Sequence, residues 1–152
     1  MQQLAQLAVE EALRAGADYA DARIVRLSQE QLGVRNGKLS MADAPEEFGL
    51  GVRVMKQGCW GFAAAPGLPS DLADVVPGVA RRAYKAARDL GPARRTPIQL
   101  AAEAGHVGEY HTPIQIDPFR VSLRDKVDLL RRAEAAVHVR SEVVAGESML
   151  GV

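Results

Sequence analysis

The fold is decided by residues 34–66, which read VRNGKLSMADAPEEFGLGVRVMKQGCWGFAAAP. Near its start lies the pair Asn36-Gly37, and both residues tolerate the positive φ angles that a two-residue type I′ turn requires. The flanking stretches LGVR and KLSM are rich in strand-forming residues. This pattern predicts a β-hairpin with Asn36 and Gly37 at its tip.

The second half of this stretch has the period of two that is typical of a half-buried strand. Lys56-Gln57-Gly58 then predicts a turn, and residues 59–64 return with Trp60 and Phe62 on one face. A second pair of antiparallel strands is therefore expected. The apolar residues that alternate along the first of these strands are Phe48, Leu50, Val52 and Val54.

Working outward, residues 19–27 and 29–35 also have strand-like patterns, so we predict an antiparallel meander from Tyr19 to Ala64. Apolar residues at three- and four-residue steps predict helices over residues 3–15, 70–90 and 122–140. The expected fold class is α+β, with one antiparallel sheet of four or more strands covered by about three helices.

Local signals delimit these helices. Gly16 is expected to end the first helix, and Ser70 is expected to cap the second. Pro77 predicts either a kink in the second helix or a later start of its regular part. Ser122, with Asp125 three residues on, predicts the cap of the third. The apolar stripes are Leu4, Ala8, Ala12 and Ala15 in the first helix, Leu72, Val76, Val79, Ala83, Ala86 and Leu90 in the second, and Leu123, Val127, Leu130 and Val137 in the third.

Two segments have no expected partner in the chain. Residues 93–119 lack periodicity and contain three prolines, which predicts a long extended excursion over the surface. Residues 142–152 have the pattern of a strand without a returning neighbour. Because an unpaired strand is an aggregation hazard, we expect the natural protein to continue or another chain to cover this edge.

Composition limits the classes of function. The chain has 152 residues, enough for one compact domain over residues 1–152, and its 19 basic and 19 acidic residues cancel. A net charge of zero gives no general attraction to nucleic acid or to anionic lipid. No stretch is long and apolar enough to span a membrane, and the only cysteine is Cys59. We therefore expect a cytoplasmic protein.

A search for catalytic groups finds little. The string GHVGEYH places His106, Glu109 and His111 together, but the five-residue spacing of the histidines does not fit a helical zinc motif, so a solvated loop is favoured over a metal site. Cys59 is interpreted as a buried small residue, and His138 as a surface or partly buried side chain. We expect no catalytic residue and no metal ligand in this chain.

Positive charge collects around the end of the second predicted helix. Cations near a helix C-terminus complement the helix dipole, and they also keep the outer face solvated. That interpretation is favoured over contact with phosphate, and a nucleic-acid partner is not expected. The residues concerned are Arg81, Arg82, Lys85, Arg88, Arg94 and Arg95.

Glycines within the strands need a physical reason, because glycine weakens a strand. Gly49, Gly51 and Gly61 could allow the close approach of a peptide strand, of another domain or of a covering helix, and the helix is slightly favoured. Arg53 and Trp60 flank this glycine-rich surface. We select Arg53, Trp60 and Gly61 as candidate substrate-binding residues.

Several separated motifs resemble the N-terminal region of the TldD/PmbA family. They are GADYADARIV at 16–25, the stretch 34–66 quoted above, ARRAYKAARDL at 80–90 and EYHTPIQIDPFRVSLRDKVDLLRRAEAAV at 109–137. The last of these is closer to the TldD-like branch. The resemblance spans almost the whole chain.

The resemblance implies a zinc metalloprotease family, historically labelled modulators of DNA gyrase, whose members are considerably longer than this chain. Their H-E-x-x-x-H zinc motif is absent here, so no metal or catalytic residue carries over, and zinc is implied only for the full-length protein. The chain alone is then expected to be inactive. Its implied role is to form part of the wall of a protease cavity and of a homo- or heterodimer, with a peptide or small unfolded protein as substrate. Glu142 to Val152 would pair with the missing part.

Two alternatives remain open. The chain could be complete and act as a non-catalytic binding or regulatory module of a partner protease or of a topoisomerase complex such as DNA gyrase. Nucleic-acid binding through the patch from Arg81 to Arg95 is the other alternative, and it predicts an affinity for DNA that falls with salt.

Overall fold

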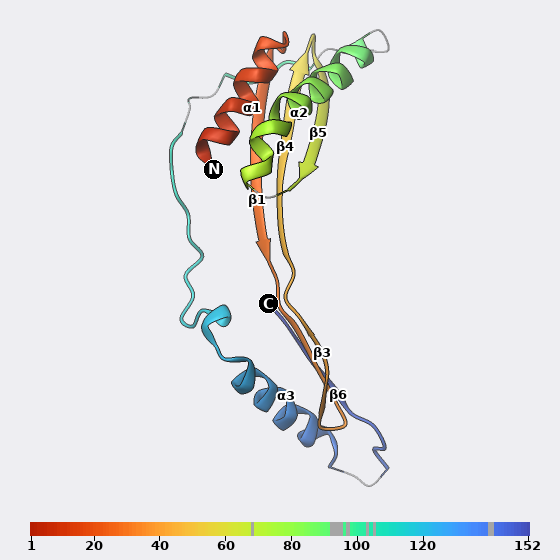
Figure 1. Cartoon of the computed structure of the whole chain (residues 1–152). Helices are drawn as coiled ribbons and strands as arrows, with labels where there is room; N and C mark the ends of the chain where they lie inside the picture. Colours follow the sequence, from red (N-terminus) through yellow and green to blue (C-terminus); the bar gives the residue numbers. More distant parts are fainter. Residues whose placement is uncertain (68, 92–95, 97, 103, 105, 140–141) are drawn as a thin grey trace. The chain divides into compact units, whose positions relative to one another are not determined.

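The computed structural model describes residues 1–67, 69–91, 96, 98–102, 104, 106–139 and 142–152 (Figure 1). Over these residues the fold is α+β, as predicted, with three α-helices and two three-stranded antiparallel sheets. The described chain divides into two compact units, which comprise residues 1–27 with 47–105 and residues 28–46 with 106–152. The elements are α1 (Gln2–Arg14), β1 (Tyr19–Ser28), β2 (Gln31–Arg35), β3 (Lys38–Asp43), β4 (Glu46–Lys56), β5 (Cys59–Pro66), α2 (Pro69–Leu90), the 3₁₀ helix η2 (Pro118–Arg120), α3 (Leu123–Val137) and β6 (Glu147–Gly151).

The first unit has a sheet in the order β1-β4-β5, and Figure 1 shows α1 and α2 together over one face of it. Alternation along β4 buries Leu50, Val52 and Val54 against the two helices, as predicted. The helices contribute small residues to this core, which lets them lie close to the sheet. Their buried residues are Ala8 and Ala12 of α1 and Val76, Val79, Ala80, Ala83 and Ala87 of α2.

The local signals predict the end of α1 but only part of α2. Gly16, at φ 107°, follows the end of α1. Helix α2 begins at Pro69, so Ser70 lies in its first turn. The helix runs through Pro77, and its regular part does not begin later. The predicted stripe of α2 is wrong at its C-terminal end, because Leu90 is exposed while Ala87 is buried.

The turn between β4 and β5 lies at Gln57-Gly58, where the predicted turn is confirmed. Gln57 and Gly58 have φ values of 49° and 73°, and Lys56 pairs with Cys59 across the turn. Asp18, just before β1, anchors this turn: the Gln57 N–H donates to its Oδ2 at 2.6 Å and the Lys56 ammonium donates to its Oδ1 at 2.8 Å. These bonds lower the pKa of the Asp18 carboxyl, the bond from Lys56 most strongly.

The second unit has a sheet in the order β3-β2-β6, with α3 packed on one face. Asn36 and Gly37, at φ values of 49° and 73°, form the tip of the β2–β3 hairpin and confirm that prediction. The buried apolar core of this unit is small. It consists of Leu32, Val34, Val127 and Leu130, with Leu150 packed against it.

Helix α3 begins as predicted, because the Oγ of Ser122 accepts a hydrogen bond from the Asp125 N–H at 3.1 Å. Its buried stripe differs from the prediction. Leu123 and Val137 are exposed, whereas Lys126 and Glu134 are almost fully buried. Both charged residues have partners in the sheet region, and those partners make their burial tolerable: Lys126 pairs with Glu30, and Glu134 accepts from the Gly37 N–H.

The prediction of a single sheet with four or more strands is wrong, and so is the simple meander. The β2–β3 hairpin is not part of the first sheet, in which β1 pairs directly with β4. Instead, β2 pairs with β6 in the second sheet. Alternation reveals that a segment is a strand, but it does not reveal which strand lies beside it. The expected absence of a partner for the last strand is also wrong, because β6 pairs antiparallel with β2 from Gln31↔Gly151 to Arg35↔Glu147.

Candidate functional site

The candidate site lies on the face of the β1-β4-β5 sheet that is turned away from α1 and α2. Because side chains alternate along a strand, Arg53 of β4 points to the face opposite Val52 and Val54. Trp60 of β5 lies on the same outer face, since it pairs with Met55. The structure therefore brings together two of the three residues selected from the sequence, Arg53 and Trp60.

Four side chains form a connected group, which we call the Arg53 cluster: Tyr19, Asp21, Arg53 and Trp60. Arg53 Nε donates to Asp21 Oδ2 at 2.8 Å, and its Cζ lies 4.6 Å from the centroid of the Trp60 ring. The ring of Tyr19 meets Trp60 edge to face, with centroids 5.8 Å apart. The bond to Asp21 raises the pKa of Arg53, so its charge is permanent, and the cation lies on an aromatic face.

The surface beside the cluster is apolar and open. Phe62, Val25 and Leu27 keep 64%, 49% and 42% of their surface exposed. A Cβ added at Gly51 would lie 3.1 Å from the Phe62 ring, so this ring rests over the backbone of β4. An exposed mixture of aromatic, aliphatic and cationic groups suits contact with an extended polypeptide better than chemistry on a small molecule.

Gly61, the third selected residue, is not part of this surface. A Cβ at Gly61 would lie 2.2 Å from the Ala83 carbonyl oxygen and 2.4 Å from the Ala87 nitrogen of α2. Of the reasons that we considered for the glycines, close packing of a helix on the sheet accounts for Gly61. Gly49 has no such neighbour, because its Cβ would be in ordinary contact with Ala65.

Tyr19 and Asp21 were not selected from the sequence. Each lies in a strand whose alternation was clear, but their contact with Arg53 and Trp60 depends on the pairing of β1 with β4. The signal that could have found Asp21 is a carboxylate on a strand face that also carries an arginine, which favours a cross-strand pair.

The residues that the structure describes do not fit a zinc centre. Among them no group of three or more His, Cys, Asp or Glu side chains could hold a metal ion. His111 pairs with Glu109, at 3.0 Å, and both side chains are largely exposed. Gly105 of the same string lies outside the described residues. Cys59 is a buried free thiol.

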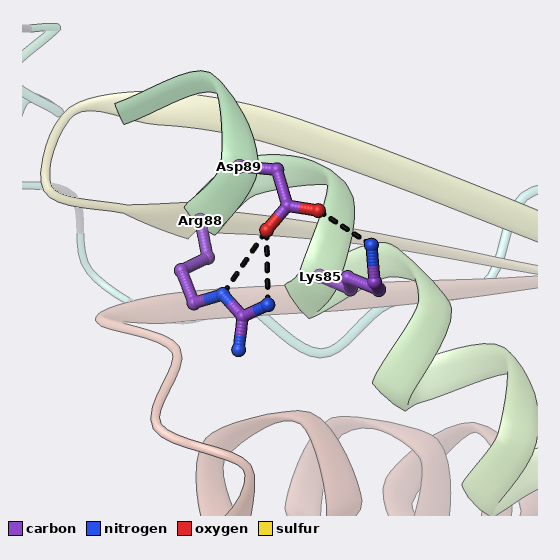
Figure 2. A network of polar contacts seen from close by, with 3 residues as sticks. All are labelled: Lys85, Arg88 and Asp89. Atoms are coloured by element: carbon purple, nitrogen blue, oxygen red, sulfur yellow. Dashed lines mark hydrogen bonds and ion pairs between the residues drawn. The ribbon is translucent and has the colours of Figure 1, made fainter. Parts of the chain in front are cut away.

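The basic patch of α2 is partly neutralised within the helix. Figure 2 shows Asp89 between two of its cations, with Lys85 Nζ at 2.6 Å and Arg88 Nη2 at 2.9 Å. These contacts lower the pKa of Asp89, the bond from Lys85 most strongly. Arg94 and Arg95, which were counted in the patch, lie outside the described residues.

Within the described part of the chain, every helix is too short or too polar to traverse a bilayer.

Comparison with known proteins gives a family match over part of the chain and a shared fold over nearly all of it. Residues 20–87 match the family model described as PmbA/TldA metallopeptidase domain 1. No curated protein matches the chain significantly.

Solved structures share the fold of nearly the whole chain. TldE from Thermococcus kodakarensis matches with a TM-score of 0.63 at 14% identity, over 97% of this chain and 33% of its own. A protein described as a proposed modulator of DNA gyrase from Bacteroides thetaiotaomicron matches with a TM-score of 0.73 at 17% identity, over 99% of this chain and 34% of its own. A similarly described protein from Thermotoga maritima matches with a TM-score of 0.60 at 17% identity, over 99% and 32%. The chain thus spans about a third of the length of each structure.

Proposed function

We propose that this chain is an N-terminal domain of the PmbA/TldD family and serves as the scaffold domain of a zinc metalloprotease, forming part of the wall of its substrate cavity. The substrate class is peptides or small unfolded proteins. In this proposal the catalytic metal and its ligands belong to another part of the protein, and the functional assembly is a homo- or heterodimer of family members.

The observation that carries the proposal is the match of residues 20–87 to the first domain of a metallopeptidase family. The matching segment includes residues of both compact units, since residues 28–46 belong to the second. We therefore treat residues 1–152 together as one N-terminal domain. The share of about a third of the related structures supports a role as one component of a larger enzyme.

The chemistry of the described side chains supports a wall rather than a catalytic centre. Zinc catalysis needs three protein ligands around an open position, and the described residues provide no such set. We therefore derive no catalytic step in this chain. We assign substrate binding to the outer face with the Arg53 cluster and Phe62, because this face combines flat aromatic area with a fixed cation.

A titration followed by intrinsic fluorescence tests the proposed surface. Trp60 is the only tryptophan of the chain, so its emission reports directly on the Arg53 cluster. A synthetic tryptophan-free peptide without stable structure should change that emission on binding. Arg53→Gln should raise the Kd of the peptide by about tenfold, because the cation over the ring is lost.

Arg81→Gln is the matched control, since Arg81 is an exposed arginine on α2. An unchanged Trp60 emission, or an equal loss of affinity in both variants, would refute the surface. A separate assay tests whether the catalytic residues lie outside this chain. The 152-residue chain, supplied with zinc, should then cleave no peptide. Stoichiometric zinc together with peptidase activity would refute that part.

A second candidate function is a non-catalytic binding or regulatory module, with a partner protease or DNA gyrase as its target. The observation that favours it is that two of the related structures are described as proposed modulators of DNA gyrase. Direct binding of purified gyrase by this chain, with no effect of Arg53→Gln, would favour the second candidate over the first.

A further inference from the structure

The second unit contains a buried carboxylate that is only half satisfied. Glu134 of α3 is 2% exposed, and its Oε2 accepts a hydrogen bond from the Gly37 N–H at 2.6 Å. Its other oxygen, Oε1, is buried and has no hydrogen-bond partner among the described residues. A buried acceptor without a partner costs free energy, so this oxygen calls for an explanation.

One side chain is positioned to supply the missing bond. His138 lies one helical turn after Glu134, and its Nε2 is 3.8 Å from Glu134 Oε1. This separation exceeds a hydrogen bond by an amount that a small tilt of the ring removes. The space between the two side chains is left by Gly146, where a Cβ would lie 2.5 Å from His138 Nε2 and 3.1 Å from Glu134 Cγ.

The position of His138 also favours a positive charge on its ring. His138 is the C-terminal cap of α3, and its backbone N–H donates to the Ala135 carbonyl. The last turn of α3 contains no basic residue. A protonated imidazole there would complement the negative end of the helix dipole and the carboxylate of Glu134 together.

Among the described residues, the other charged groups of this region have contacts of their own or are exposed. Arg131 Nε donates to the Gly37 carbonyl at 3.2 Å, and its guanidinium also lies 3.6 Å from Asp128. The charged neighbours on the other packed elements, Arg35 and Lys38 of the hairpin and Glu147 of β6, are exposed. Asn36 Oδ1 accepts from the Gly146 N–H, which brings the segment before β6 to the same turn.

We propose that Glu134, His138 and the Gly37 amide form a proton-operated clasp that fastens the tip of the β2–β3 hairpin to α3. With a solvent proton on the ring, His138 donates to Glu134 Oε1, and the paired carboxylate holds the Gly37 N–H through Oε2. Without that proton the charge pair is lost and the hairpin tip loosens. The clasp is therefore closed while the ring carries the proton and opens as the pH rises.

Amide hydrogen exchange of the full chain, followed by NMR, tests the clasp. The protection of the Gly37 amide, expressed against the unfolded-chain rate at each pH, should fall by about tenfold as the pH rises, because the charge-assisted bond between His138 and Glu134 is lost. The Gln57 amide is the internal reference, since it donates to a carboxylate at the same distance in a turn without a histidine.

His138→Gln should keep the fold and make the Gly37 protection independent of pH at the lower level. A flat wild-type profile would overturn the clasp, as would an unchanged pH dependence in His138→Gln. The same titration with EDTA distinguishes a proton from a metal ion, and a profile abolished by EDTA would also overturn it. Glu134→Gln is a further variant. If it unfolds the second unit, the result for His138→Gln alone tests the clasp.

Discussion

The two β-hairpins of this protein have the same turn but different anchors. Gln57-Gly58 and Asn36-Gly37 both have φ values of 49° and 73°, and in each turn one backbone N–H donates to a carboxylate at 2.6 Å. Asp18 anchors the first turn at the surface, beside Lys56. Glu134 anchors the second from a buried position on α3. Turns with the same φ values are thus compatible with opposite electrostatic environments.

The difference continues through the two units. The described core of the first unit is made of alanine, valine and leucine, packed so closely that only glycine fits at residue 61. The second unit buries few apolar residues and places Lys126 and Glu134 among them. We infer that buried polar contacts fix the strand register of the second unit, which has a small sheet and one covering helix. In the first unit, close packing of apolar side chains has that role.

The largest expected effect concerns the shape of the first core. Gly61→Ala places a Cβ against the backbone of α2, and atoms of a helix backbone cannot move aside independently, so the free energy of unfolding should fall by about 3 kcal/mol. Gly49→Ala in the neighbouring strand is the control and should change it by less than about 1 kcal/mol. Urea denaturation followed by circular dichroism measures both. Equal effects would show that the close approach is unimportant.

The next effect concerns the buried pair in the second unit. Lys126→Met removes the partner of Glu30 and leaves a partly buried carboxylate unpaired, so the protection of the β2 amides should fall strongly, corresponding to about 3 kcal/mol. Lys126→Met combined with Glu30→Leu should recover most of the loss. Hydrogen exchange measures both variants. A double variant as unstable as the single one would contradict a cost that arises from the unpaired charge.

The smallest effect is the response of the surface anchor to acid. Because its bonds lower the pKa of Asp18, the carboxylate stabilises the fold above its ordinary pKa of 3.8, and this contribution is lost as the pH falls through the lowered value. The protection of the Gln57 amide should therefore drop a few-fold between about pH 5 and 2. Asp18→Asn keeps an acceptor that does not titrate, so its profile should be flat. The two turns then respond to pH in opposite directions.

Sequence reasoning succeeded where the determining contacts are local. The Asn36-Gly37 turn and the Ser122 cap are confirmed because each depends on residues within one turn of chain. It failed where the partner is distant in the chain. The pairing of β1 with β4 decides that Tyr19 and Asp21 meet Arg53 and Trp60, and no periodicity within a strand encodes that choice.

The buried face of α3 shows a second limit. Apolar spacing placed Leu123 and Val137 in the core, although both are exposed, and it did not include Lys126 and Glu134, since charged residues are normally solvated. Their burial depends on Glu30 and Gly37, which lie in a different part of the sequence.

The central position of β2 has a consequence for biosynthesis. During synthesis, β3 pairs with one edge of β2 soon after β2 itself is made. The other edge stays unpaired until β6 is made, since Gln31 pairs with Gly151. This strand edge therefore stays exposed on the ribosome until residues 147–151 have been translated. Chaperone protection in that interval should matter more for the second sheet than for the first, which β5 completes early.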